Sequence, residues 1–227
     1  MIITIDGPAA VGKSTVARQV ARKLGFTHFD TGAMYRALTW SLIEAGSDVS
    51  AERAVAHLNA IDISFSGEQI GRRVYVDGRE VTEDIRHPRV DAAVSAVAQI
   101  EEVRRIMVGR QRLLATNGSF VVEGRDAGSV IFPDAQVKVF LTASVRERAR
   151  RRQGDFAAAD KMMSQEVVER ELAARDRVDS GRAVDPLVKA PDAHVIDTTT
   201  KNVREVVSTV LRLAGERGAK SARRGSA

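Results

Sequence analysis

Short apolar runs alternate along this chain with longer segments in which apolar residues recur every three or four positions. The chain opens with the apolar run 2–5, which predicts a buried strand. Val16, Val20 and Leu24 then share one helix face, so we expect a helix over 14–24. The same patterns predict further strands over 27–30, 120–123, 137–141 and 194–197, and helices over 33–45, 51–60, 89–115 (interrupted or bent), 144–152, 160–176 and 202–213.

The pattern changes between residues 61 and 85. The stretches IDISF, RRVYV and REVTEDI predict three short strands, and Asp77-Gly78 between the last two favours a two-residue hairpin turn. We interpret this region as a small antiparallel insert. Elsewhere strands alternate with helices, which predicts an α/β fold with a parallel five-stranded sheet and helices on both faces. Ligands bind such sheets at the carboxyl ends of the strands.

Composition narrows the class of protein without identifying it. The 227 residues fit one domain, contain no cysteine and carry a formal net charge of +5, with a pI of about 9.9. No apolar run is long enough to cross a membrane and no secretory signal is visible, so we expect a cytoplasmic protein with no membrane partner. Arginine outnumbers lysine by 28 to 7. This bias reflects either codon usage in a GC-rich genome or phosphate binding, because a guanidinium binds phosphate oxygens in pairs.

The loop after the first strand carries the most specific signal. Residues 7–14, GPAAVGKS, fit the pattern G-x-x-x-x-G-K-[ST] and lie between a strand and a helix, as that pattern requires. Glycines let backbone N–H groups approach phosphate oxygens, and the positive end of the helix dipole adds to the attraction. Lys13 would contact the β- and γ-phosphates, and the Ser14 hydroxyl would ligate Mg²⁺. Unless the match is due to chance, the chain binds a nucleoside triphosphate.

Two charged segments follow strands at the same edge of the predicted sheet. In DTGAMYRA, Thr31, Tyr35 and Arg36 would form a pocket for a second phosphate and a base. Alternatively, Thr31 would cap the helix and Tyr35 would pack in the core. In EGRDAGSVIFPDA, Arg125 and Asp126 would either face a ligand or close their loop as a local ion pair. The residues alone leave these alternatives open.

Arginines are concentrated in two further segments. Five arginines lie between Arg146 and Arg152 and cannot all share one helix face. They belong either to a lid that closes over a phosphoryl group or to a basic surface helix. In RDRVDSGR, Asp179 lies between Arg175 and Arg182, either as part of a site or as an ion-paired helix end.

Together these stretches resemble the bacterial cytidylate kinases, which are nucleoside monophosphate kinases acting on CMP and dCMP. The matching segments are GPAAVGKST, DTGAMYRA, EGRDAGSVIFPDA, RDxxDSxR over 175–182 and PLxxAxDAxxIDTT over 186–199, in this order. The resemblance covers roughly residues 2–213. It implies a P-loop core (1–35, 110–143 and 185–214), an NMP-binding part with the insert (36–109), a helical lid (about 144–171) and a basic tail (215–227) that we expect to be disordered.

The resemblance also implies roles for individual residues. ATP and Mg²⁺ would be the cofactors and CMP or dCMP the acceptor, handled by a monomer with no nucleic-acid partner. The ATP phosphates would be bound by Gly7, Pro8, Ala9, Ala10, Val11, Gly12, Lys13, Ser14 and Thr15 and covered by the lid residues Arg148, Arg151 and Arg152. The CMP phosphate would be bound by Arg36, Arg125 and Arg182, and cytosine by Ser95, Arg104 and Asp126. The ribose would be bound by Arg175 and Asp179, with Thr31 and Tyr35 also in the acceptor pocket. Catalysis would depend on Lys13, Arg125, Arg151 and Arg182. Ser14 replaces a glycine and Thr31 a serine found in other members, and neither change removes a needed hydroxyl.

The expected acceptor is already a phosphate oxyanion, so the transfer needs no general base, and none of the four histidines falls in the charged segments. Two other classes remain open. One is a P-loop kinase for a small alcohol, of the shikimate type, with Asp30 at the acceptor hydroxyl. The other is a nucleic-acid-binding protein that uses ATP as a switch or motor. An aromatic content of 4% offers few side chains for stacking bases and weighs against the second class.

Overall fold

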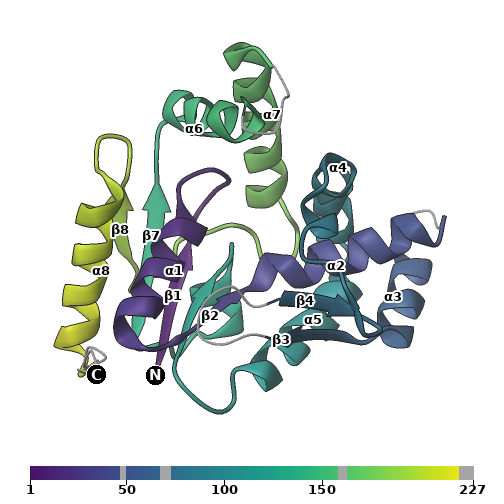
Figure 1. Ribbon diagram of the computed structural model, residues 1–227, viewed down its shortest axis with the longest axis horizontal. Helices are drawn as coiled ribbons and strands as arrows, with labels where there is room; N and C mark the ends of the chain where they lie inside the picture. The colour runs from purple at the N-terminus through teal and green to yellow at the C-terminus, as the bar shows by residue number, and fades with distance from the viewer. Residues whose placement is uncertain (47–49, 67–72, 158–162, 220–227) are drawn as a thin grey trace.

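Five parallel strands form the central sheet, as the sequence predicts (Figure 1). The computed structural model describes residues 1–46, 50–66, 73–157 and 163–219. The strands lie in the order β2-β6-β1-β7-β8 and comprise β1 Ile2–Asp6, β2 Thr27–Asp30, β6 Phe120–Glu123, β7 Val137–Thr142 and β8 His194–Asp197. Because β1 is the middle strand, the loop that follows it lies at the centre of the carboxyl edge of the sheet.

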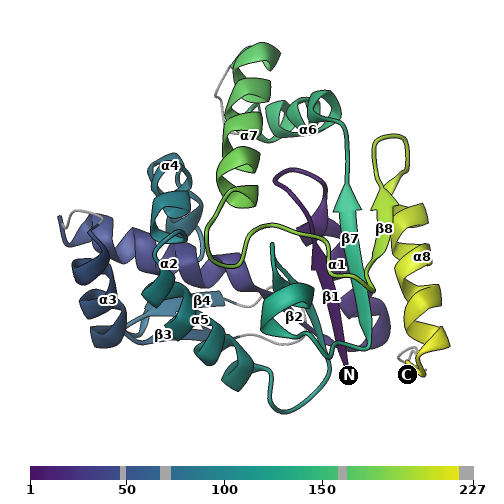
Figure 2. The ribbon, with the colours of Figure 1, turned by 180° about the vertical axis from the view of Figure 1, so that it is seen from behind.

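Helices cover both faces of this sheet (Figures 1 and 2). The four helices packed on it are α1 Lys13–Leu24, α2 Thr31–Glu44, α5 Glu101–Leu114 and α8 Val203–Glu216. Ile3 and Ile5 point to the face covered by α1 and α8 and form one core cluster with them. Phe29 and Val122 belong to a second cluster that includes residues of α2 and α5. The alternation of side chains along each strand therefore produces two apolar layers, one on each face.

The predicted antiparallel insert is present beside α2. It contains helix α3 and the three-stranded sheet β3-β4-β5, followed by a 3₁₀ helix η1 and helix α4; their bounds are α3 Ala51–Ala60, β3 Ile63–Ser66, β4 Arg73–Val76, β5 Arg79–Glu80, η1 Asp84–Arg86 and α4 Pro88–Val97. Asp77 and Gly78 form the predicted turn with positive φ angles of 49° and 79°. The strand expected over 79–85 is much shorter, because the Thr82 hydroxyl takes the place of a backbone acceptor for the Val74 N–H at 3.0 Å.

Three helical predictions need correction in their bounds. The stretch 89–115 forms two helices, α4 and α5, because Ile100 has an extended backbone with ψ of 112° and starts the second helix. In the predicted lid, α6 at Val145–Ala157 extends further than the helix expected over 144–152, whereas α7 at Gln165–Ser180 begins and ends later than the helix expected over 160–176, and Ser164 caps α7. Part of the expected second lid helix, residues 158–162, lies outside the described residues.

Helix α8 ends at Glu216, so the first two residues of the expected tail 215–227 belong to this helix. Residues 220–227 lie outside the part of the chain that the structure describes. Among the helices it does describe, none combines the length and the apolar character needed to cross a membrane. Helices α6 and α7, which we predicted to form a lid, stand above the carboxyl ends of β1 and β7, at the end of the sheet opposite the N-terminus (Figure 1).

A buried carboxylate fixes the loop after β6. The Asp6 side chain accepts hydrogen bonds from the backbone N–H groups of Ala127 (2.8 Å) and Gly128 (2.7 Å), which open the short π-helix η2 (Ala127–Ile131). Burial raises the pKa of Asp6 to about 6, although these two hydrogen bonds oppose the rise. Gly128 packs so closely that an added Cβ would lie 2.6 Å from the Thr4 hydroxyl oxygen. This contact holds residues 124–126 in place at the carboxyl edge of the sheet.

We predict that Gly128→Ala destabilises the protein by on the order of 1–3 kcal/mol, because the new methyl group overlaps buried atoms that cannot all move. Gly109→Ala is the matched control: Gly109 is exposed within α5 and an added Cβ there meets no neighbour within 4 Å. That change should stabilise the protein by about 1 kcal/mol through helix propensity. Urea unfolding of both variants measures the difference, and a Gly128→Ala midpoint equal to that of the unaltered protein would contradict the close packing.

Candidate active site

A large cavity of about 1050 Å³ lies between the carboxyl edge of the sheet, α2, α5 and the helices α6 and α7. Three of the residues expected at the site from the sequence, Gly7, Pro8 and Arg148, are not among the described residues that line it. The others all line this cavity: Ala9, Ala10, Val11, Gly12, Lys13, Ser14, Thr15, Thr31, Tyr35, Arg36, Ser95, Arg104, Arg125, Asp126, Arg151, Arg152, Arg175, Asp179 and Arg182. Segments far apart in the sequence are thus brought to one place.

The loop between β1 and α1 is compact and depends on one glycine. Gly7 has a φ of 145°, and a Cβ there would overlap the backbone carbonyl oxygen of Leu141 on β7. The Lys13 ammonium is buried and donates to the carbonyl oxygens of Gly7 (2.8 Å) and Pro8 (2.6 Å). Burial lowers the pKa of Lys13 well below its usual value, and the nearby Arg125 lowers it further. Lys13 is therefore a buried cation that gains from an anion at the mouth of the loop.

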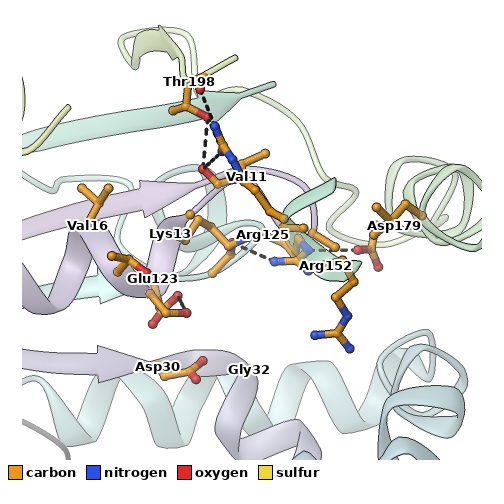
Figure 3. A pocket seen from close by; sticks show the side chains of 18 of the residues that line it. Val11, Lys13, Val16, Asp30, Gly32, Glu123, Arg125, Arg152, Asp179 and Thr198 are labelled. Atoms are coloured by element: carbon orange, nitrogen blue, oxygen red, sulfur yellow. Dashed lines mark hydrogen bonds and ion pairs between the residues drawn. The ribbon is translucent and has the colours of Figure 1, made fainter. Parts of the chain in front are cut away.

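Two acidic side chains, Asp30 and Glu123, lie at the ends of β2 and β6 (Figure 3). The Ser14 hydroxyl donates to Glu123 Oε2 at 2.6 Å, and His28 Nε2 lies 2.7 Å from Glu123 Oε1. Burial would raise the pKa of Glu123, yet His28 and Ser14 hold it below its usual value. Asp30, at the end of β2, also lines the cavity, and burial together with the charge of Glu123 raises its pKa.

The alternative role of Thr31 as a helix cap is not observed. Asp30 caps α2 by accepting a hydrogen bond from Ala33 N at 3.2 Å, whereas Thr31 donates its hydroxyl to the Glu123 carbonyl oxygen at 2.8 Å. Sequence reasoning did not identify Glu123 or His28 as part of the site. The available signal was a carboxylate at the end of a strand that is otherwise entirely apolar, and Glu123 is indeed only 3% exposed.

A buried arginine and a carboxylate form the deep end of the cavity. Arg104 of α5 is 2% exposed and makes an ion pair with Asp126, while its guanidinium lies 5.7 Å from the centre of the Tyr35 ring. Ser95 of α4 lines the same cavity. Tyr35 is both buried in the core and part of the cavity wall, so the two alternatives for it are compatible.

The local ion pair suggested for Arg125 and Asp126 is absent. Arg125 instead donates through Nε to Asp179 of α7 at 2.9 Å, a contact visible in Figure 3. Arg182 donates from its Nε to the Asp179 carbonyl oxygen at 3.1 Å, and its Nη2 is buried without a hydrogen-bond partner. Asp179 therefore joins the loop after β6 to the residues that follow the lid.

Asp91 of α4 binds arginines from both sides of the cavity and was not predicted from the sequence. It lies 2.6 Å from Arg36 of α2, 2.6 Å from Arg152 of α6 and 3.8 Å from Arg175 of α7. Burial would raise the pKa of Asp91, but Arg36 and Arg152 hold it below its usual value. Burial lowers the pKa of Arg175 to about 10, and Arg125 and Arg36 contribute. These guanidinium groups are crowded enough to favour a further anion between them.

The arginines of α6 point in different directions, as their spacing requires. Arg148 is 4% exposed, pairs with Asp176 of α7 at 2.7 Å and donates to Ala9 O, so it supports the lid and the loop from behind the cavity. Arg151 donates to the hydroxyl and carbonyl oxygens of Thr198 at 3.0 and 2.6 Å. Arg151 and Arg152 line the cavity, and so does Arg150, which was not singled out from the sequence.

We predict that Gly7→Ala lowers the affinity for a nucleoside triphosphate about 100-fold, since the loop must shift to avoid the Leu141 carbonyl, and shifts near 1 Å have effects of this size. Ala10→Gly is the control in the same loop. Ala10 has a φ of 59°, which suits glycine better than alanine, so this change should leave affinity unaltered. Calorimetric titration of both variants checks the prediction, and triphosphate binding by Gly7→Ala with ordinary affinity would refute it.

Comparisons with known proteins agree with this arrangement. The family model described as cytidylate kinase matches residues 3–216. The chain is 46% identical over 211 residues to the cytidylate kinase of Pelotomaculum thermopropionicum, covering 92% of this chain and 93% of the relative. It is 47% identical over 216 residues to that of Geobacillus thermodenitrificans, with 95% and 96% covered. The crystal structure of an uncharacterized protein from Eubacterium ventriosum, 10% identical, superposes with a TM-score of 0.51 over 93% of this chain and 96% of that one, a likeness of fold alone. With nearly its whole length matched by the family model and by these two relatives, the chain belongs to the cytidylate kinase family.

Proposed function

We propose that this protein transfers the γ-phosphate of ATP to CMP or dCMP, giving CDP or dCDP. Family membership supports the activity. The observation that carries the proposal is the presence in one cavity of a triphosphate-binding loop and, at the deep end, the buried pair Arg104 and Asp126. The first suits the donor and the second suits a pyrimidine base.

Cytosine has a hydrogen-bonding pattern that this buried pair can satisfy. Its N4 amino group donates, and a carboxylate such as Asp126 accepts from it. Its N3 and O2 atoms accept, and the Arg104 guanidinium donates. Uracil carries a carbonyl in place of the amino group and an N–H in place of N3, so both contacts would be lost, each at a cost of about 1–3 kcal/mol.

The phosphate of CMP would bind among Arg36, Arg125 and Arg182. Arg182 has a buried, unpartnered Nη2, which is the kind of donor that a phosphate oxygen satisfies. The ribose would lie near Arg175 and Asp179, and Thr31 and Tyr35 would complete the acceptor pocket. Lys13 and the backbone of the loop over 7–15 would hold the ATP phosphates, with Arg151 and Arg152 above them.

The reaction would depend on bringing two polyanions into line and neutralising their charge. The acceptor oxygen of CMP is already ionised, so no base has to remove a proton from it. His28 is close to the site but its contact is with Glu123, which fits a role in holding that carboxylate rather than in proton transfer. Closure of the lid arginines would exclude water, which limits hydrolysis of ATP.

The residues at the mouth of the loop fit Mg²⁺. The Ser14 hydroxyl, Glu123 and Asp30 provide oxygen atoms, which this ion prefers. Among the described residues no three or more acidic, histidine or cysteine side chains form a complete metal site. This agrees with an ion that enters with the triphosphate and keeps most of its ligands as phosphate and water. Bound there, Mg²⁺ would neutralise charge on the phosphates.

One chain supplies the loop, the acceptor pocket and the lid, so we propose a monomer whose partners are its nucleotides. We also propose that the protein acts in the cytoplasm, because ATP and CMP are metabolites of that compartment.

We predict that ADP release, measured with a panel of CMP, dCMP, UMP, AMP, shikimate and single-stranded DNA, is fastest with CMP and dCMP. UMP should be at least about 10-fold poorer in kcat/KM, since it loses hydrogen bonds to buried groups. Turnover with shikimate alone would indicate a small-alcohol kinase, and stimulation by DNA alone would indicate a nucleic-acid-dependent ATPase. Either result would refute the proposal.

We further predict that Arg125→Ala and Arg182→Ala each lower kcat/KM for CMP by about 10²- to 10³-fold, because each removes a donor that neutralises phosphate charge. The KM for ATP should change little. Arg146→Ala is the matched control, since Arg146 is an exposed lid arginine and does not appear among the described residues around the cavity. Near-normal turnover in both site variants would exclude the arginine clamp.

A further inference from the structure

We propose that Asp185 is a positioning residue that orients Arg104 for recognition of the pyrimidine base. This inference rests on the proposed function, since it assigns a role within the acceptor pocket. Asp185 lies in the segment after α7, three residues beyond Arg182. It accepts a hydrogen bond from Arg104 Nε at 3.0 Å. It is not among the described residues that line the cavity, so it acts on the ligand only through Arg104.

Three contacts from three different segments define the orientation of the Arg104 guanidinium. Nε donates to Asp185, Nη1 donates to the Ala98 carbonyl oxygen at 3.4 Å, and Nη2 pairs with Asp126. The Ala98 contact is long, so the two carboxylates provide the strong contacts. A planar guanidinium held at one nitrogen can still pivot about that contact, whereas one held at Nε and Nη2 is fixed in its plane.

Asp185 also leaves Asp126 available to a ligand. Asp126 would have to accept from the cytosine amino group while it pairs with Arg104. A second carboxylate on the other side of Arg104 shares the charge of that arginine, which is only 2% exposed and has to be compensated. Burial raises the pKa of Asp126 above its usual value and the charge of Asp185 adds to the rise, while Arg104 and Arg182 oppose it.

The backbone at Asp185 indicates that its placement is specific. Its φ is +48°, in the left-handed region that glycine and, less readily, asparagine and aspartate adopt. Only Ala10, Asp77 and Asp185 among the described non-glycine residues have positive φ. Glycine would be the simplest residue at such a turn, so the aspartate side chain has a use that offsets the strained backbone.

This backbone conformation provides a direct test. Asp185→Gly removes the carboxylate and suits the turn, so the fold should survive. Asp77→Gly is the matched control, because Asp77 has a φ of +49° in the hairpin of the insert and makes its side-chain contact with Asp62 N, not with Arg104. Asp185→Asn keeps an acceptor for Nε and also tolerates the left-handed conformation.

We expect Asp185→Gly to raise the KM for CMP about 10-fold, as for the loss of one charge-assisted hydrogen bond to a group in the site. The ratio of kcat/KM for CMP to that for UMP should fall about 10-fold. The reason is that a misplaced Arg104 loses its hydrogen bond to cytosine N3, a bond that uracil does not make. The KM for ATP and the urea midpoint should stay as in Asp77→Gly. Asp185→Asn should recover part of the KM effect, because it restores the acceptor for Nε but not the negative charge. Calorimetry with CMP alone should show the tightest binding for the unaltered protein, weaker binding for Asp185→Asn and the weakest for Asp185→Gly.

Two results would overturn the proposal. One is an unchanged KM for CMP and an unchanged CMP-to-UMP ratio in Asp185→Gly. The other is an equal loss for CMP and ATP together with lower stability in both Asp185→Gly and Asp185→Asn, which would indicate a structural role. Failure of the proposed function is distinguishable, because the unaltered protein would then not phosphorylate CMP at all, and both proposals would fall together.

Discussion

Repulsion between guanidinium groups is the constraint on which this site depends. One cavity is lined by Arg36, Arg125, Arg152, Arg175 and Arg182. Like charges gathered in one cavity repel each other more strongly where water is scarce. Burial is the main cause that lowers the pKa of Arg175 to about 10, and the neighbouring Arg125 and Arg36 lower it further. The structure tolerates this repulsion because carboxylates lie between the arginines.

These carboxylates also hold the parts of the molecule together. Asp179 of α7 binds Arg125 from the loop after β6, and Asp91 of α4 binds Arg152 from α6. Each pair joins segments that are more than fifty residues apart in the chain. The same ion pairs therefore balance the charge of the cavity and set the relative positions of α4, α6, α7 and the loop after β6. A substitution that removes a carboxylate affects position as well as charge.

The fold was predictable from local periodicity, because strands of four to six residues and helices of ten or more have distinct patterns of burial. The triphosphate loop was predictable because its contacts lie within eight consecutive residues. The pairing of side chains between distant segments was not predictable from the sequence. Nothing near Asp91 or Asp185 in the sequence indicates that arginines of other helices contact them. Arg148 was assigned to the cavity because helical spacing does not reveal which face packs on α7, where its partner Asp176 lies.

Several arginines of the cavity already pair with carboxylates, so under the proposed function an incoming phosphate would displace a carboxylate as well as be attracted by the positive charge. A phosphate bound by Arg36 would compete with Asp91 for the same guanidinium, and it would have the advantage of nearly twice the charge and more acceptor oxygens. The net gain in binding free energy would then be the difference between two ion pairs. Asp91 also holds Arg152 of the lid. A ligand that drew Arg36 away from Asp91 would thereby change the charge that Arg152 faces, so ligand binding beside α2 would be coupled to the position of α6.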